Sequence, residues 1–264
     1  MPELPEVEAV RRELQPVMEG ARFEAVLTNR PNLRTAFPPD FAERLTGRTV
    51  RSLQRRGKYL LAELSSNEIL VMHLGMSGSF RLEPGAANDR HDHVVFRMSS
   101  GATIVFNDPR RFGFMNLVSR DALTGHRGVG ALGPEPLSAA FDGSALAIAC
   151  RGKKTSLKAA LSDQRVVAGL GNIYVCEALH RAQLSPRRRA LTIATKAGAP
   201  RASAIRLTQA IKKVLLAAVT RGDANRFRVY DREGERCPTR RCGGVIRRIT
   251  QSGRSTFFCP ACQK

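Results

Sequence analysis

Four cysteines near the end of the chain form the pattern best suited to chemistry. Four residues separate Cys237 from Cys242, sixteen residues follow, and two residues separate Cys259 from Cys262. Four thiolates at this spacing can close a tetrahedron around Zn²⁺, and a single hairpin can present both pairs. Because four sulfur ligands leave no open position on the metal, we predict one structural zinc, which stabilises a segment too short to have a core of its own.

The charge of the chain is unevenly distributed. The sequence has 43 Lys and Arg against 23 Asp and Glu, a formal net charge of +20. Residues 1–149 hold 18 basic and 17 acidic side chains, whereas residues 150–264 hold 25 and 6. This excess indicates a polyanionic partner, most simply nucleic acid, and two domains with different roles. A solubilising basic surface is the alternative interpretation.

Neither a membrane span nor a secretion signal is expected. Hydrophobic residues make up 42% of the chain and charged residues 25%, and no run of 18 apolar residues occurs. The opening MPELPEVEAVRREL lacks the apolar segment of a signal peptide. We therefore expect a cytoplasmic protein with no membrane partner.

The elements that position these residues change along the chain. Apolar residues spaced by three and four predict a helix over residues 4–18. From Ala21 to about Val118 short β-rich runs alternate with turn residues, which is typical of an antiparallel sandwich or barrel. These runs are FEAVLT, TVRSLQ, YLLAEL, EILVMHL, HVVFRM, ATIVF and FMNLV.

The second half of the chain has a different pattern. The segment GVGALGPEP at residues 128–136 is rich in Gly and Pro and is the best candidate for a domain boundary. Helical spacing follows near residues 155–163, 173–183 and 201–220. The chain ends in a predicted β-hairpin, VIRRIT–QSG–RSTFF, framed by the cysteine pairs, and its arginines are expected to contact phosphates.

Five tracts occur in the order MPELPEVE, HLGMSG, NDPRRFG, GLGNIY and the cysteine hairpin. Together they closely resemble the bacterial formamidopyrimidine-DNA glycosylase family over essentially the whole chain. The resemblance implies an α+β fold with a catalytic β-sandwich domain (1–130), a helical domain with a helix–two-turn–helix motif (131–228) and a zinc hairpin (229–264). It also implies a monomeric base-excision repair enzyme that acts on damaged double-stranded DNA at the nucleoid, removing oxidised purines and then nicking the strand as a lyase.

The resemblance makes Pro2 the nucleophile and Glu3 its acid. If Met1 is removed, Pro2 presents a secondary amine, which can attack the sugar C1′ and form an iminium adduct. An α-amino group has a pKa near neutrality, so a nucleophilic fraction exists without special tuning. Glu3 could then protonate the sugar ring oxygen. From this tract alone, a Pro and a Glu that merely start a helix would be the preferred interpretation.

Two basic residues complete the implied catalytic set. Lys58, in the turn Arg55–Lys58, matches a family lysine that aids β-elimination and contacts phosphate beside the lesion. Arg254, at the tip of the zinc hairpin, matches an arginine that binds phosphates around the damaged nucleotide and is linked to δ-elimination. For each residue, a solvated turn is the alternative.

A further group of residues is expected to contact DNA. Met76, Arg110 and Phe112 match a trio that fills the gap left by an extruded base, with Arg110 bonding to the orphaned cytosine. Their glycine-rich flanks favour exposed loop tips over core packing.

Asn172, Lys154 and His91 also match family DNA contacts. Asn172 could cap the following helix while its amide contacts a phosphate, although a plain N-cap explains its position equally well. His91 could instead be an ordinary surface histidine.

The chain departs from the family pattern at two places. The first cysteine pair has four intervening residues where two are usual, which zinc tolerates. Only seven residues separate Gly222 from Tyr230, where 8-oxoguanine-specific members have a longer loop that closes over the extruded base. We therefore expect weaker or altered discrimination for 8-oxoguanine, with the abasic-site lyase activity least affected.

Two rival functions remain open. An endonuclease VIII-like glycosylase for oxidised pyrimidines is favoured by the short loop but opposed by the ELPE opening and the Arg110–Phe112 tract. A non-catalytic zinc-containing protein that binds damaged DNA is opposed by the presence of Pro2, Glu3 and Lys58.

Overall fold

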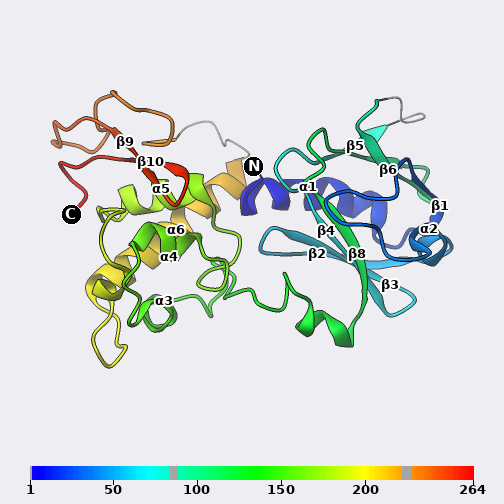
Figure 1. Cartoon of the computed structure of the whole chain (residues 1–264), viewed down its shortest axis with the longest axis horizontal. Coiled ribbons are helices and arrows are strands. Elements are labelled where there is room, and N and C mark those ends of the chain that lie inside the picture. The colour runs from blue at the N-terminus through cyan, green and yellow to red at the C-terminus, as the bar shows by residue number, and fades with distance from the viewer. Residues whose placement is uncertain (1, 84–88, 222–226) are drawn as a thin grey trace. The chain divides into compact units, whose positions relative to one another are not determined.

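The structure is a computed structural model that describes residues 2–83, 89–221 and 227–264 (Figure 1). The chain divides into two compact units, Met1–Ala131 and Leu132–Lys264, and each is described by itself. In the described part of the chain, no helix is both long enough and apolar enough to cross a membrane.

The first unit opens with α1 (Leu4–Met18), which spans the residues predicted to be helical. One face of α1 is buried, through Leu4, Val7, Leu14 and Met18, as the spacing of three and four requires. The helix packs chiefly against β2 (Val50–Arg56). The first unit therefore positions its N-terminal residues by fixing this helix on a sheet.

Two four-stranded antiparallel sheets follow in this unit. One has the order β2-β3-β4-β8 and the other β1-β6-β7-β5. The remaining strands of the first sheet are β3 (Tyr59–Leu64), β4 (Glu68–His73) and β8 (Phe114–Ser119). Those of the second are β1 (Phe23–Thr28), β5 (Ser79–Glu83), β6 (Asp92–Met98) and β7 (Thr103–Asn107).

The two sheets share one hydrophobic core. It includes Leu60 and Leu70 from the first sheet and Phe96 and Phe106 from the second, each no more than 1% exposed. Along β3 buried and half-buried residues alternate, as expected for a strand with one face on the core. The prediction of an antiparallel sandwich is confirmed.

Three elements of the first unit were not predicted. Strand β5 (SFRLE) alternates polar and apolar residues over only five positions, lies at a sheet edge and buries only Phe80. The helix α2 (Phe41–Leu45) and the 3₁₀ helix η1 (Asp121–Gly125) have five residues each, too few for a helical period to show.

The second unit is helical and ends in a hairpin. Its helices are α3 (Gly143–Cys150), α4 (Leu157–Ser162), α5 (Asn172–Arg181), η2 (Ala190–Ile193) and α6 (Ala202–Arg221). The predicted helices near 155–163, 173–183 and 201–220 correspond to α4, α5 and α6. The hairpin pairs β9 (Arg247–Gln251) with β10 (Arg254–Phe258).

Helix α3 was not predicted because its sequence, GSALAIAC, has no polar stripe opposite an apolar one. Its start is nevertheless marked locally, since the Asp142 side chain accepts a hydrogen bond from Ala145 N at 2.8 Å. The α+β class is confirmed for the whole chain.

Candidate active site and nucleic-acid interface

The N-terminus of α1 positions Glu3 directly after Pro2. Glu3 N donates to Glu6 Oε2 at 2.8 Å, and the Glu3 side chain accepts from Glu6 N, forming a reciprocal capping box. Glu3 is buried, with 1% exposure, and Pro2 is half-buried. The helix start thus fixes the carboxyl group of the residue that directly follows the candidate amine.

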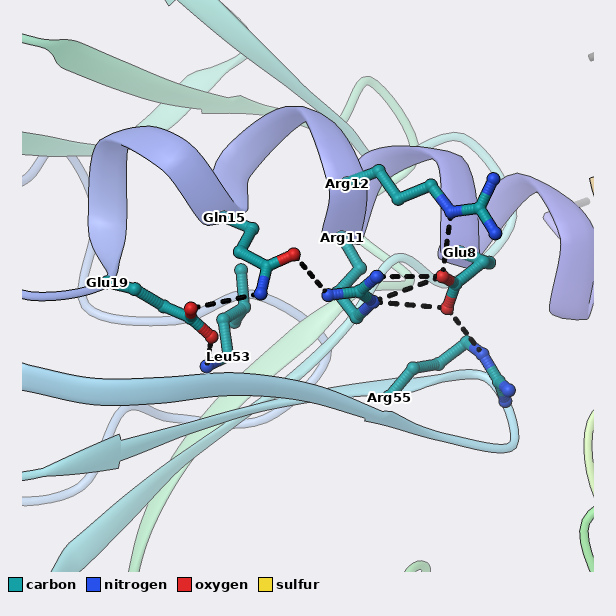
Figure 2. A network of polar contacts seen from close by, with 7 residues as sticks. All are labelled: Glu8, Arg11, Arg12, Gln15, Glu19, Leu53 and Arg55. Atoms are coloured by element: carbon teal, nitrogen blue, oxygen red, sulfur yellow. Dashed lines mark hydrogen bonds and ion pairs between the residues drawn. The ribbon is translucent and has the colours of Figure 1, made fainter.

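Lys58 lies in the tight turn between β2 and β3. Arg56 pairs with Tyr59, so the loop consists of two residues, and Gly57 has a φ of 59°, which favours glycine. The N-terminal end of α1 and this turn lie at the same end of the unit (Figures 1 and 2). Pro2, Glu3 and Lys58 therefore come from neighbouring elements.

His73, at the end of β4, connects the Lys58 turn to the Met76 loop. Its ring lies 4.9 Å from that of Tyr59, and its Nδ1 accepts a hydrogen bond from Gly75 N at 3.0 Å. Burial lowers the pKa of His73 to about 4, and the positive charges of Lys58 and Arg34 contribute. A neutral imidazole is required here, because a protonated Nδ1 could not accept from Gly75.

The Met76 loop packs against the loop of Phe112 through their backbones. A Cβ atom on Gly75 would lie 2.3 Å from the carbonyl carbon of Phe112, and Gly75 has a φ of 66°. A side chain at Gly75 would therefore separate the two loops.

Asp108 is the buried centre of this region and was missed from the sequence. Its side chain is fully buried. Its Oδ1 accepts from Ser77 Oγ at 2.6 Å and its Oδ2 from Gly113 N at 2.8 Å. Ser77 Oγ in turn accepts from Arg110 N at 3.2 Å. One carboxylate therefore fixes both loops of the predicted DNA interface.

The three residues expected to fill the DNA gap lie exposed on these loops. Met76 is 41% exposed and Phe112 40%, which is unusual for large apolar side chains. The Arg110 guanidinium lies over the Phe112 ring, 4.6 Å from its centroid. Apolar surface beside a cation suits contact with stacked bases and their polar edges.

His91 belongs to the same region. Its carbonyl accepts from Asp108 N at 3.0 Å, and its ring Nε2 accepts from Arg90 Nε at 2.9 Å. The structure thus brings His91, Met76, Arg110 and Phe112 together around Asp108.

In the second unit, the predicted capping role of Asn172 is wrong. Gly171 is the N-cap of α5, and Asn172 is the first helical residue. The Asn172 Nδ2 atom donates to Ser255 O in the hairpin at 2.9 Å. Because Gly171 is the N-cap, the Asn172 side chain is able to connect the start of α5 to β10.

Gln164, which was also missed from the sequence, holds the turn that precedes α5. Its side chain accepts a hydrogen bond from Gly169 N and donates one to Leu170 O, each at 2.8 Å.

Arg254 is exposed at the start of β10, next to the two-residue loop Ser252–Gly253. Both loop residues have positive φ, 51° and 70°, as a type I′ hairpin turn requires. Burial and the nearby Arg254 charge both lower the pKa of Lys158 in α4, a buried lysine that the sequence did not single out. Lys154 is exposed between α3 and α4.

The four cysteines fit a structural zinc. Cys237 Sγ lies 3.7 Å from Cys262 Sγ, and Cys242 Sγ lies 3.6 Å from Cys259 Sγ. All four sulfur atoms lie within 4.8 Å of one another. Tetrahedral zinc with Zn–S bonds of about 2.3 Å needs sulfur atoms about 3.8 Å apart. Thiolates of these four residues would hold the ion and fill its coordination sphere.

The zinc hairpin is also bound to α5. His180 Nε2 lies 3.4 Å from Cys237 Sγ and 3.2 Å from Thr239 Oγ1. Through these contacts His180 orients the cysteine cluster from outside. Cys176 is buried among the hairpin residues Ile246 and Phe257. Cys150 and Cys176 are both buried in the core, and burial raises the pKa of the Cys150 thiol to about 11.

Family models cover most of the chain. Residues 1–115 match the formamidopyrimidine-DNA glycosylase N-terminal domain, and residues 132–228 match the H2TH domain of the same family. Residues 234–264 match a zinc finger found in these glycosylases and in isoleucyl-tRNA synthetases.

Full-length relatives are named formamidopyrimidine-DNA glycosylases. The chain is 59% identical to a formamidopyrimidine-DNA glycosylase of Rhodopseudomonas palustris and 56% identical to one of Bradyrhizobium diazoefficiens, each alignment covering 100% of both chains.

Two solved structures share the fold, each with a TM-score of 0.89 and 34% identity. One is the Lactococcus lactis enzyme bound non-covalently to DNA with an abasic site, where 99% of each chain is covered. The other is MutM in complex with DNA containing carbocyclic 8-oxoguanine, where 100% of each chain is covered. This chain therefore belongs to the formamidopyrimidine-DNA glycosylase family.

Proposed function

We propose that the chain is a bifunctional DNA glycosylase and abasic-site lyase of base-excision repair, with the mature Pro2 amine as nucleophile. The observation that carries this proposal is the capping box, which holds a buried Glu3 beside Pro2 at the start of α1. Family membership supports the reaction class, and the geometry supports the roles of the residues.

The proposed reaction begins with extrusion of the damaged nucleotide. The Pro2 nitrogen attacks C1′ while the bond to the base breaks, and Glu3 supplies a proton to the sugar ring oxygen. The resulting iminium acidifies C2′, so that loss of a proton expels the 3′ phosphate by β-elimination. A second elimination expels the 5′ phosphate, and a final hydrolysis frees Pro2.

Other residues are proposed to hold the DNA. Lys58 and Arg254 bind phosphates around the extruded nucleotide, and Lys154, Asn172 and His91 bind further backbone positions. Met76, Arg110 and Phe112 fill the gap in the stack. We further propose domain limits of 1–130, 131–228 and 229–264, a monomeric enzyme, and action at the nucleoid in the cytoplasm.

Lesion choice is a separate proposal, based on sequence alone. The shortened segment falls largely on residues 222–226, which lie outside the described residues. The alignment with the Rhodopseudomonas relative runs over 293 positions, whereas this chain has 264 residues, so 29 alignment positions have no residue of this chain. The proposal places part of this difference in the shortened segment. We expect ring-opened purines to be excised better than 8-oxoguanine opposite cytosine. Equal excision rates for the two lesions would contradict this.

Borohydride trapping tests the proposed nucleophile. The protein is incubated with lesion-bearing duplex and borohydride, and the adduct is mapped by peptide mass. We expect one covalent adduct on an N-terminal peptide that begins at Pro2. An adduct mapped to Lys58, or no adduct, would overturn the proposal.

A further inference from the structure

Arg55 forms a bridge between the two elements that carry the candidate catalytic groups. Its Nε donates to Glu8 Oε2 in α1 at 3.1 Å, and its Nη1 donates to Gly57 O in the β2–β3 turn at 3.0 Å. Gly57 directly precedes Lys58. One planar guanidinium thus joins the helix that follows Pro2 and Glu3 to the turn that carries Lys58. Figure 2 shows its contact with Glu8.

The bridge is sheltered from solvent. The side chain of Arg55 is 11% exposed and that of Glu8 is 14% exposed. Burial opposes ionisation of Glu8, but bonds and charges from Arg11, Arg12 and Arg55 outweigh it and lower the pKa of Glu8. Such a charge pair is stronger and more directional than a fully exposed one.

A second tie fixes the other end of the helix. Gln15 Nε2 donates to Glu19 Oε2 at 2.9 Å, and Glu19 Oε1 accepts from Leu53 N in β2 at 2.7 Å. Helix α1 is therefore attached to β2 at two points about three turns apart (Figure 2). Two attachments restrict both sliding and rotation of α1. Of the two, the Arg55 attachment also reaches the turn that carries Lys58.

We propose that Arg55 is a positioning residue that sets Lys58 relative to the Pro2–Glu3 end of α1, so that elimination follows imine formation. This inference rests on the proposed function and adds to it a residue outside the implied catalytic set. Two hydrogen bonds to different partners are essential, because a lysine at this position offers a point charge rather than the two diverging N–H donors of a guanidinium.

Arg11 provides a matched control. It donates to the same Glu8 carboxylate at 2.9 Å, and it also donates to Gln15, which lies within α1, at 2.7 Å. Replacing Arg11 therefore removes a comparable ion pair without touching the turn. The variants are Arg55→Met, Arg55→Lys and Arg11→Met, with Lys58→Met as the reference for loss of the lysine.

Three measurements test the proposal. Borohydride trapping measures imine formation, and nicking of a preformed abasic duplex measures elimination. Amide hydrogen exchange measures how well the backbone of residues 56–60 is held in place. We expect Arg55→Met to leave trapping within about twofold but to slow nicking by about 10- to 100-fold. Adding Lys58→Met to Arg55→Met should cause little further loss, because the two residues act in one step.

The two remaining variants separate positioning from general stability. Arg55→Lys should keep the melting temperature yet nick as slowly as Arg55→Met. Arg11→Met should nick like the parent and leave exchange in the 56–60 turn unchanged. Unchanged exchange in Arg55→Met, or equal losses in trapping and nicking, would overturn the proposal. Failure of the proposed function would instead be seen in the parent protein, as absence of a Pro2 adduct.

Discussion

The hydroxyl of Ser77 donates to Asp108 Oδ1 at 2.6 Å while it accepts from the backbone nitrogen of Arg110. The other carboxylate oxygen accepts from Gly113 N. Both ends of the segment that displays Arg110 and Phe112 are thus fixed by one buried carboxylate. The same carboxylate holds the loop of Met76 through its neighbour Ser77.

Replacing Asp108 by Asn should loosen this interface. An amide NH₂ group must face either Ser77 or Gly113, where the carboxylate offers acceptors to both. We expect the free energy of unfolding to fall by about 1–3 kcal/mol and the preference for cytosine opposite the lesion to weaken. Urea unfolding and excision opposite each base check this. The exposed Asp121→Asn variant should change neither, and unchanged values in Asp108→Asn would contradict the role given to it.

Acid should destabilise the first unit through His73. Its pKa is about 4 in the folded protein and about 6.5 in an unfolded chain. Between these values the unfolded chain binds a proton that the folded protein does not, so stability falls as the pH falls. The loss amounts to about 2–3 kcal/mol near pH 4.

Comparison with His73→Asn isolates this contribution. The asparagine Oδ1 can still accept from Gly75 N but does not titrate. Urea unfolding at pH 7.5 and pH 4.5 should show a smaller pH dependence in the variant than in the parent. Equal dependence in the two proteins would show that His73 is not responsible.

Glu177 anchors the chain just after residues 222–226. Its side chain is buried and accepts from Arg228 N, Val229 N and Tyr230 N, each at 2.9 Å. In Glu177→Gln the amide NH₂ group must face one of these donors. We expect a loss of about 1–3 kcal/mol, measured by thermal or urea unfolding.

The exposed Glu235 offers a control for Glu177, since it pairs with Arg232 at 2.6 Å in solvent. Glu235→Gln should leave stability unchanged. If Glu177→Gln has the same free energy of unfolding as the parent, the backbone of residues 228–230 does not depend on the carboxylate.

Removing two zinc ligands should unfold the hairpin. In Cys242→Ser/Cys259→Ser, one residue of each cysteine pair is lost. Metal analysis should fall from one zinc per chain to none, and affinity for duplex DNA should fall because Arg247, Arg248 and Arg254 lose their common support. Cys150→Ala, which removes a thiol in α3, should keep one zinc. A full complement of zinc in the double variant would contradict the four-cysteine site.

Local patterns were enough to predict the scaffold. The helix over residues 4–18 has one apolar stripe, strands such as β1 and β3 are bounded by turn residues, and the cysteine pairs specify their metal without any tertiary information. Short elements, such as the five-residue helices α2 and η1, lack a helical period in the sequence.

The residues that support the site could not be predicted in this way. Asp108 matters because Ser77, 31 residues away in sequence, lies within hydrogen-bond distance of it. Arg55 matters because α1 packs on β2, and Asn172 contacts Ser255 rather than capping its own helix. Each role depends on a partner that only the folded chain brings near.

Blocking the N-terminus tests the central claim most directly. The chain that begins at Pro2 is compared with the same chain acylated at its Pro2 nitrogen, and nicking of an abasic-site duplex is measured for both. An acylated nitrogen is an amide and cannot form an iminium, so nicking should fall to the background rate while duplex binding persists. Equal nicking rates for the free and acylated chains would contradict the account.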